Sequence, residues 1–244
     1  MKISSLCRIA AAVGFSLAAL SSHAFIITDT GTTAGNPPSS LFNVGIGLAD
    51  IGDSFTLNYA GSGASSGLAA RSVITVTSLS PGLLGLSISL TNLTSSALQA
   101  AIVSYGLSVT PNALDVIVTN TPAVFTGVFL NTAPLQAFPG GFEQIDVCGA
   151  PATFTTCEGG TIGSGLQSGN LTDTVNILVA AAFSPALGAI PSATLDAFPI
   201  RFQTSFGSFE LAGTPEIQVV PEPASLLLLG AGVLGFAARR RRTA

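Results

Sequence analysis

Leu86-Ser87-Ile88-Ser89-Leu90 decides the fold class of this chain, because large apolar and small hydroxyl side chains alternate along it. Successive side chains of a β-strand point to opposite faces of a sheet, so the three apolar residues would share one face and the two serines the other. The same period of two recurs at 55–59 (Phe-Thr-Leu-Asn-Tyr), 73–76 and 107–109. Gly, Pro, Asn or Ser bound each stretch, as expected where strands end in turns.

Further candidate strands extend this pattern along the chain; they are Leu114–Val118, Val124–Leu130, Phe142–Cys148, Thr174–Ala182, Phe198–Phe206 and Ser208–Val219. Short strands separated by turn residues are typical of two antiparallel sheets packed face to face. We therefore predict an all-β fold, an antiparallel β-sandwich that forms one domain. Pro199 has no N–H to donate, so we expect it on an edge strand or at a bulge.

The central part of the chain, residues 25–220, is strongly acidic. Its only basic side chains are Arg71 and Arg201, against eleven acidic residues, which gives a formal charge of −9. The acidic residues are Asp29, Asp50, Asp53, Asp115, Glu143, Asp146, Glu158, Asp173, Asp196, Glu210 and Glu216. Because nucleic-acid phosphates need cationic partners, we expect no nucleic acid as a partner.

The first 24 residues have the parts of a secretory signal peptide. Lys2 and Arg8 precede the apolar run Ile9–Leu20, and Ser-His-Ala at 22–24 places small residues at the outer positions of a cleavage triplet. We therefore predict a cleaved N-terminal signal helix, with the cut between Ala24 and Phe25. The alternative is a permanent transmembrane helix, for which the run is short.

A second apolar segment lies at 224–238, where fifteen consecutive residues carry no charge. As a helix they would span about 22 Å, so neighbouring residues must help to cross the ~30 Å hydrocarbon layer. Pro221-Glu222-Pro223 precedes the segment, and a proline is tolerated where a helix starts. Arg239, Arg240, Arg241 and Arg242 follow it and favour the cytoplasmic side. We predict a C-terminal transmembrane helix that leaves the preceding domain outside.

These three parts, in this order, resemble the PEP-CTERM sorting signal of Gram-negative bacteria: a Pro-Glu-Pro motif, a transmembrane helix and a basic cluster. The resemblance implies processing by an exosortase, a protease of the inner membrane, on the way to the cell surface. It implies that Pro221, Glu222 and Pro223 form the recognition motif and that Arg239–Arg242 form the basic stop. An ordinary C-terminal anchor is the alternative. The predicted organisation is a signal peptide at 1–24, an exported β-rich domain at 25–218 and the sorting signal at 219–244.

Cys148 and Cys157 are the cysteines that remain after removal of the signal peptide, which takes Cys7 with it. Thiols oxidise in an exported compartment, so we predict a disulfide between them. It would close a loop of about ten residues and contribute about 2.5–3 kcal/mol in the chain-entropy model. A zinc site is the alternative, but without histidine in the domain it would have to recruit carboxylates. We expect no metal and no cofactor.

A narrower resemblance runs from the candidate strands near Leu86 through the 148–157 loop to Phe202–Glu210. This stretch is similar to the exported PEP-CTERM proteins called the cistern family. The resemblance implies secretion and a similar β-rich body, and it implies no chemistry.

Catalysis is limited by the residue types in the domain. Serine triads need a base, and residues 25–218 contain neither histidine nor lysine. A pair of carboxylates could still hydrolyse glycosides, and Asp50 and Asp53 are close in sequence. However, Asp53-Ser54 precedes a strand, where these residue types favour a turn. Loop carboxylates could hold calcium, but no D-x-[DN]-x-[DN]-G sequence is present.

Two functions from different classes follow from the sequence. The first is a non-enzymatic exported protein of the cell surface or extracellular matrix, associated with exopolysaccharide or other glycans and processed by an exosortase at the inner membrane. The second is an exported carboxylate-dependent glycan-processing enzyme with the same sorting signal. We expect the first, a structural or binding protein and not an enzyme. Paired acids lining one cleft would favour the second, and acids scattered over turns would favour the first.

Overall fold

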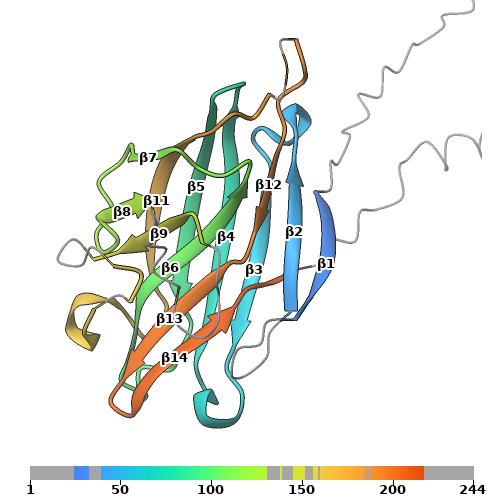
Figure 1. Cartoon of the computed structure of the whole chain (residues 1–244). Coiled ribbons are helices and arrows are strands. Elements are labelled where there is room, and N and C mark those ends of the chain that lie inside the picture. Colours follow the sequence, from blue (N-terminus) through green and yellow to red (C-terminus); the bar gives the residue numbers. More distant parts are fainter. Residues whose placement is uncertain are drawn as a thin grey trace, which may run out of the picture. The chain divides into compact units, whose positions relative to one another are not determined.

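The strands of this chain form two antiparallel sheets (Figure 1). The structure is a computed structural model, and it describes residues 25–32, 40–130, 138, 145–151, 156–158, 160–184, 186 and 188–216. The predicted signal helix at 1–24 and the predicted transmembrane helix at 224–238 lie outside the described residues.

The nine-stranded sheet has the order β1-β2-β12-β6-β13-β14, and β10, β9 and β8 extend it beside β6. Its strands are β1 (Ile26–Thr32), β2 (Ser40–Ile46), β6 (Ala100–Thr110), β8 (Gly127–Leu130), β9 (Val147–Ala150), β10 (Leu166–Gln167), β12 (Ala193–Asp196), β13 (Pro199–Thr204) and β14 (Gly207–Ala212). β6 lies at the centre of this sheet, because it pairs with four strands: β13 at residues 100–105, β12 at 108–110, β10 at 101–102 and β9 at 105–107.

The six-stranded sheet has the order β15-β3-β4-β5-β11-β7. Its strands are β3 (Ser54–Ala60), β4 (Ala69–Leu79), β5 (Leu83–Asn92), β7 (Asp115–Val118), β11 (Leu171–Ala180) and β15 (Thr214–Pro215). Within the described residues, three short 3-10 helices lie in connections, namely η1 (Leu48–Asp50), η2 (Gly63–Ser65) and η3 (Ile162–Ser164). In Figure 1, β6, β13 and β14 lie across β3, β4 and β5, so the two sheets pack face to face.

Apolar side chains from both sheets fill the space between them. In β5 the predicted alternation is present, because Ser87 and Ser89 are partly exposed while the residues between and around them are buried, namely Leu84, Leu86, Ile88 and Leu90. Phe55 on β3 packs edge to face against Phe198, which lies between β12 and β13, with ring centroids 5.8 Å apart. Each such buried side chain contributes roughly 1.5–3 kcal/mol. The predicted all-β sandwich is confirmed.

β6 is longer than the sequence predicts. Only 107–109 shows the period of two, yet all residues of β6 except the last are buried. Its outer face is covered by a second apolar cluster. Ile145 of this cluster packs so closely on β6 that a Cβ added at Gly106 would lie 2.8 Å from its side chain. That cluster consists of Phe138, Ile145, Cys148, Cys157 and Ala212. A strand buried on both faces needs no polar residue at alternate positions, so its sequence loses the alternation.

The sequence pattern also misses β1, β2, β10 and β12 and misplaces some strand ends. The predicted strand at 208–219 is two strands in different sheets, β14 and β15, which Gly213 separates. A Cβ on Gly213 would lie 2.9 Å from the Tyr59 ring, so glycine allows the close approach at this crossing. The predicted strand at 142–148 corresponds to β9, and residues 142–144 lie outside the described residues.

Pro199 does not lie on an edge strand. β13 is an interior strand between β6 and β14, and the irregularity in its register falls between Arg201 and Phe202. Pro199 is the first residue of β13, and pairing with β6 starts only at Ile200. A proline at the first position of a strand is tolerated because the ladder bonds to the neighbouring strand begin after it.

Candidate functional site

The residues predicted to direct sorting fall outside the described part of the chain. This applies to Ala24, Pro221, Glu222, Pro223 and the arginines Arg239, Arg240, Arg241 and Arg242. The described part of the chain contains no helix with the length and apolar character needed to span a bilayer. Phe25 and Glu216 are the described residues that lie nearest in sequence to the predicted cleavage site and to the sorting segment.

Both neighbours are fixed to β3 of the domain. Phe25, the predicted first residue after cleavage, is 9% exposed, and its ring packs edge to face on Phe55 with centroids 5.1 Å apart. Glu216 donates its backbone N–H to the carbonyl oxygen of Thr56 at 2.8 Å, directly after β15 pairs with β3. The folded domain thus extends to within five residues of Pro221.

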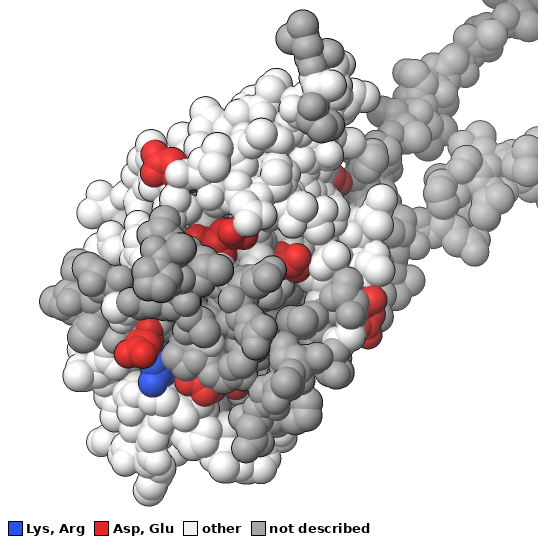
Figure 2. Space-filling model, viewed as in Figure 1, with Lys and Arg blue, Asp and Glu red and all other residues white. Residues whose placement is uncertain are grey.

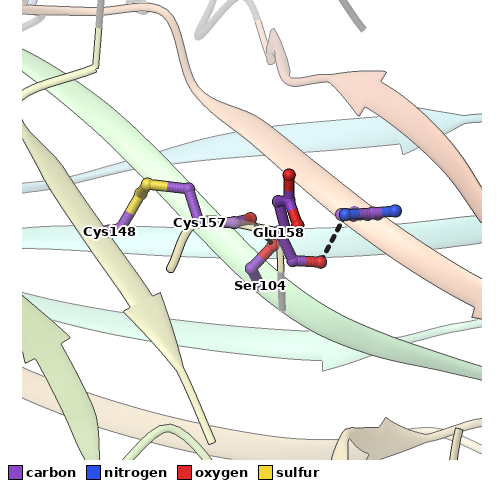
Figure 3. The surroundings of a disulfide bond; sticks show 5 residues. Ser104, Cys148, Cys157 and Glu158 are labelled. Atoms are coloured by element: carbon purple, nitrogen blue, oxygen red, sulfur yellow. Dashed lines mark hydrogen bonds between the residues drawn. A yellow bond between two sulfur atoms is a disulfide. The ribbon is translucent and has the colours of Figure 1, made fainter. Parts of the chain in front are cut away.

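Cys148 and Cys157 form a disulfide, as predicted, with their Cα atoms 5.6 Å apart. Both residues are fully buried, Cys148 on β9 and Cys157 in the connection that follows it. Figure 3 shows Ser104 of β6 directed at the backbone of Cys157, where its Oγ donates to the Cys157 carbonyl oxygen at 2.8 Å. The disulfide holds this connection against the outer face of β6.

Arg201 on β13 continues this contact on the exposed side of the disulfide. Its guanidinium donates to the carbonyl oxygen of Glu158 and, at 3.1 Å, to Ser208 Oγ. It also forms an ion pair with Glu210, with 3.3 Å between Nε and Oε1. Partial burial raises the pKa of Glu210, and the nearby guanidinium opposes this by lowering it. Arg201 is thus occupied in joining the disulfide loop to β13 and β14.

The outward side of the six-stranded sheet presents mostly hydroxyl groups. We call its central part the hydroxyl face; it consists of twelve outward-facing residues of β3, β4, β5 and β11, of which Thr56 is only 8% exposed. These are Ser54, Thr56, Asn58, Arg71, Val73, Thr75, Ser87, Ser89, Thr91, Thr172, Thr174 and Asn176. Their neighbours along each strand are the buried residues of the core, so the strand period of two places them on the side away from it.

The strand register arranges the hydroxyl face in three rows that run across the sheet. The rows are Ser54-Thr75-Ser87-Asn176, Thr56-Val73-Ser89-Thr174 and Asn58-Arg71-Thr91-Thr172. Hydroxyls of neighbouring strands contact each other at 2.7 Å between Ser54 and Thr75, and at 2.8 Å between Thr91 and Thr172. Thr174 donates to Ser89 at 3.2 Å. Cross-strand pairs of this kind stabilise a sheet and fix the orientation of the hydroxyls.

The hydroxyl face differs from the rest of the domain in charge. None of the residues that compose it is acidic, and Arg71 is its one charged residue. Figure 2 shows acidic residues over the side of the domain seen in Figure 1, with a basic group against an acidic one. Two acidic residues lie at the two edges of this sheet: Glu216 follows β15 beside Thr56, and Asp115 of β7 pairs with Ala180 of β11. The sequence predicts a strand at each of β3, β4, β5 and β11. It does not predict the register between them, which aligns their residues into rows.

Two carboxylates that the sequence did not single out lie near each other at the end of β6. Asp146 accepts the backbone N–H of Val109 at 2.7 Å, and Asp196 on β12 pairs with Ser108. Burial raises the pKa of both groups, and the charge of Asp146 raises that of Asp196 further. A hydrogen bond from Ser108 to Asp196 partly offsets its shift. A glycosidase needs two carboxylates at a defined separation, so this interacting pair is the candidate for such an arrangement among the described residues.

Asp50 and Asp53 form a turn and not an acid pair. Asp50 Oδ2 accepts the N–H of Gly47 at 2.6 Å, and the Asp50 carbonyl accepts the N–H of Asp53 at 3.0 Å. Asp50 lines a surface groove, whereas Asp53 is not among the described residues that line it. Among the described residues, no three His, Cys, Asp or Glu side chains come together as a metal site would require.

The sorting segment has a counterpart among known families. The family model described as the PEP-CTERM protein-sorting motif matches residues 219–242, a range that includes Pro221–Pro223 and all four C-terminal arginines. No match was found among curated proteins. The similarity to the cistern family stays a prediction, because the family match covers the sorting segment alone. The motif implies processing by an exosortase, a membrane protein, and hence a membrane-anchored precursor that is exported and sorted to the cell surface. This chain is therefore a protein that carries the PEP-CTERM sorting signal first indicated by its Pro-Glu-Pro sequence, apolar segment and arginine cluster.

Proposed function

We propose that this protein is a non-enzymatic component of the cell surface or extracellular matrix that binds exopolysaccharide through its hydroxyl face. The sorting motif supports delivery to the surface. The observation that carries the binding role is the surface of ordered hydroxyls and amides that lacks carboxylates in an otherwise acidic domain.

The chemistry of this face suits a polysaccharide. Hydroxyl groups of Ser and Thr donate and accept hydrogen bonds, as sugar hydroxyls do, and the Asn58 and Asn176 amides add two donors each. The rows run across four neighbouring strands, so an extended polymer laid along a row would contact several strands at once. The face contains no aromatic residue on which a sugar ring could stack, so each contact is weak and binding depends on many contacts along the polymer.

Binding by the hydroxyl face can be tested with paired charge substitutions. Thr172→Asp together with Thr174→Asp places two carboxylates on the exposed end of two rows. Thr28→Asp together with Thr110→Asp adds the same charge at exposed positions of the other sheet. We expect the first double variant to lose co-fractionation with the exopolysaccharide of producing cells, while the control retains it. Equal co-fractionation of both variants would contradict the role of this face.

The sorting step has its own test. We expect the protein from cells with an active exosortase to have lost the segment beyond Pro223 and to reach the surface, and protein from cells without the protease to keep it. Mass spectrometry and cell fractionation measure both properties. The same mass and location in both strains would indicate an ordinary anchor.

One observation favours the second candidate function, a carboxylate-dependent glycan-processing enzyme. Asp146 and Asp196 interact electrostatically, and burial raises the pKa of both, as a general acid requires. In this case Asp146→Asn and Asp196→Asn would each abolish the release of reducing sugar from the exopolysaccharide. The binding role predicts no such release by the native protein.

A further inference from the structure

We infer that the hydroxyl face recognises a carboxylate group on the polysaccharide at Arg71, an inference that rests on the proposed function. Arg71 on β4 lies in register with Asn58 on β3 and Thr91 on β5, and Thr172 on β11 continues the row. Neighbouring strands lie about 4.8 Å apart, so the four side chains span roughly 14 Å. A polymer laid across the strands would meet all of them.

Arg71 is available for such a contact. It is exposed, and it forms no ion pair within the described residues. The other arginine of the domain, Arg201, is engaged by Glu210, Ser208 and the Glu158 carbonyl. A guanidinium presents its N–H donors as a planar fork that matches the two oxygens of a carboxylate. Arg71 is therefore the one place on this face where an anionic group gains a charged partner.

The residues beside Arg71 suit the neutral part of an acidic sugar. Asn58 offers amide donors on one side. On the other side the hydroxyls of Thr91 and Thr172 bond to each other at 2.8 Å, and each keeps further capacity to donate or accept. The row thus combines one cationic position with neutral hydrogen-bonding groups. This arrangement matches a uronic-acid-type residue within a hydroxylated chain.

The strength of the contact explains why the partner is a polymer. An exposed ion pair changes affinity by roughly two- to fivefold, so a single acidic sugar would bind weakly. A polymer with repeated carboxylates binds many copies of the protein, or one copy in many registers, and gains from multivalency. The acids of the domain oppose a polyanion, but salt at physiological strength screens charges beyond about 8 Å. The acid that lies beside the hydroxyl face in the register, Glu216, is next to Thr56 and not in the row of Arg71.

The test compares two polymers of known charge. Processed protein recovered from exporting cells is applied to immobilised alginate, a polyuronate, and to dextran, a neutral glucan, at physiological salt. We expect Arg71→Gln to lower affinity for alginate by roughly two- to fivefold per site and to leave dextran binding unchanged. The double variant Arg71→Gln with Asp115→Asn has the native net charge but lacks the guanidinium, and we expect it to bind alginate as weakly as Arg71→Gln.

Three results would overturn the inference. They are unchanged alginate binding by Arg71→Gln, recovery of alginate binding in the double variant, and an equal loss of dextran binding. Failure of the native protein to bind either polymer would also contradict it. Co-fractionation with the exopolysaccharide of producing cells then decides separately whether the proposed function stands.

Discussion

Asp173 on β11 is a buried carboxylate that accepts three backbone hydrogen bonds. It is 5% exposed and accepts the backbone N–H groups of Ala123, Val124 and Phe125 at 2.8–2.9 Å. These bonds hold the chain between β7 and β8 against the sandwich and place Phe125 in the core, where it packs edge to face on Tyr105. A single acidic side chain therefore holds residues 123–125 in place, although these residues do not belong to a strand.

We expect Asp173→Asn to lower the free energy of unfolding by about 2–4 kcal/mol. The substitution removes the charge that strengthens three hydrogen bonds, and its NH₂ group would face N–H donors. Urea denaturation measures the change. Asp115→Asn is the matched control, because the exposed Asp115 carboxylate accepts the N–H of the adjacent Val116, and its effect should stay within about 0.5 kcal/mol. Equal effects of the two substitutions would show that the three bonds contribute no net stability.

The disulfide carries a second prediction about single residues. Replacing both Cys148 and Cys157 by alanine should cost about 2.5–3 kcal/mol, because the bond closes a loop with a sequence separation of 9. The exported protein should contain no free thiol before reduction. Two titratable thiols in the native protein would contradict this, and the unfolding free energy of the double variant tests the stability separately.

At the scale of elements, β15 connects the folded domain to the sorting segment. It is two residues long and pairs with Asn58 and Leu57 of β3. From Glu216, whose N–H is bound to Thr56, to Pro221 the chain can span at most about 17 Å. A membrane protease that binds extended peptide on the domain side of the motif would need part of this segment. Release of β15 from β3 would supply it.

We therefore expect a disulfide between β15 and β3 to slow processing. Asn58→Cys with Thr214→Cys joins two directly paired residues, and oxidation would keep β15 in place. Processing should become several-fold slower, and eight Gly/Ser residues inserted after Gln218 should restore it. The pair Thr91→Cys with Thr172→Cys locks β5 to β11 and should have no effect. Immunoblots of precursor and product over time measure the rate, and normal processing of the locked variant would rule out release of β15.

The strands also show what the sequence can and cannot predict. Strands with one face in the core and one in solvent, such as β3 and β5, were predicted because their polar and apolar residues alternate. Most of β6 was not predicted as a strand, because the second apolar cluster, which includes Cys148 and Cys157, covers its outer face and removes the alternation. The row at Arg71 could not be predicted, since it joins positions as far apart as Asn58 and Thr172, and only the register brings them together. The pairing of Cys148 with Cys157 was predictable because the domain has no other cysteine.

For the whole molecule, the balance of charge predicts how stability depends on pH. Burial raises the pKa values of Asp146, Asp196 and Glu210 above those of the unfolded chain. In the pH window between the unfolded and folded pKa values, the folded state binds more protons than the unfolded state. The stabilisation from these groups is therefore complete below the ordinary carboxyl pKa and is lost as pH rises through the raised values. Self-repulsion of the acidic domain acts in the same direction, since it grows as more carboxylates ionise.

We accordingly expect the free energy of unfolding to increase as pH is lowered from 7 towards about 4. Urea denaturation at several pH values in constant salt measures this dependence. Asp146→Asn with Asp196→Asn should be more stable than the native protein at pH 7, because it removes two partly buried charges, and its stability should change less with pH. A steady loss of stability on acidification in both proteins would contradict the prediction. It would mean that the partly buried carboxylates Asp146, Asp196 and Glu210 do not determine how the stability of the domain depends on pH.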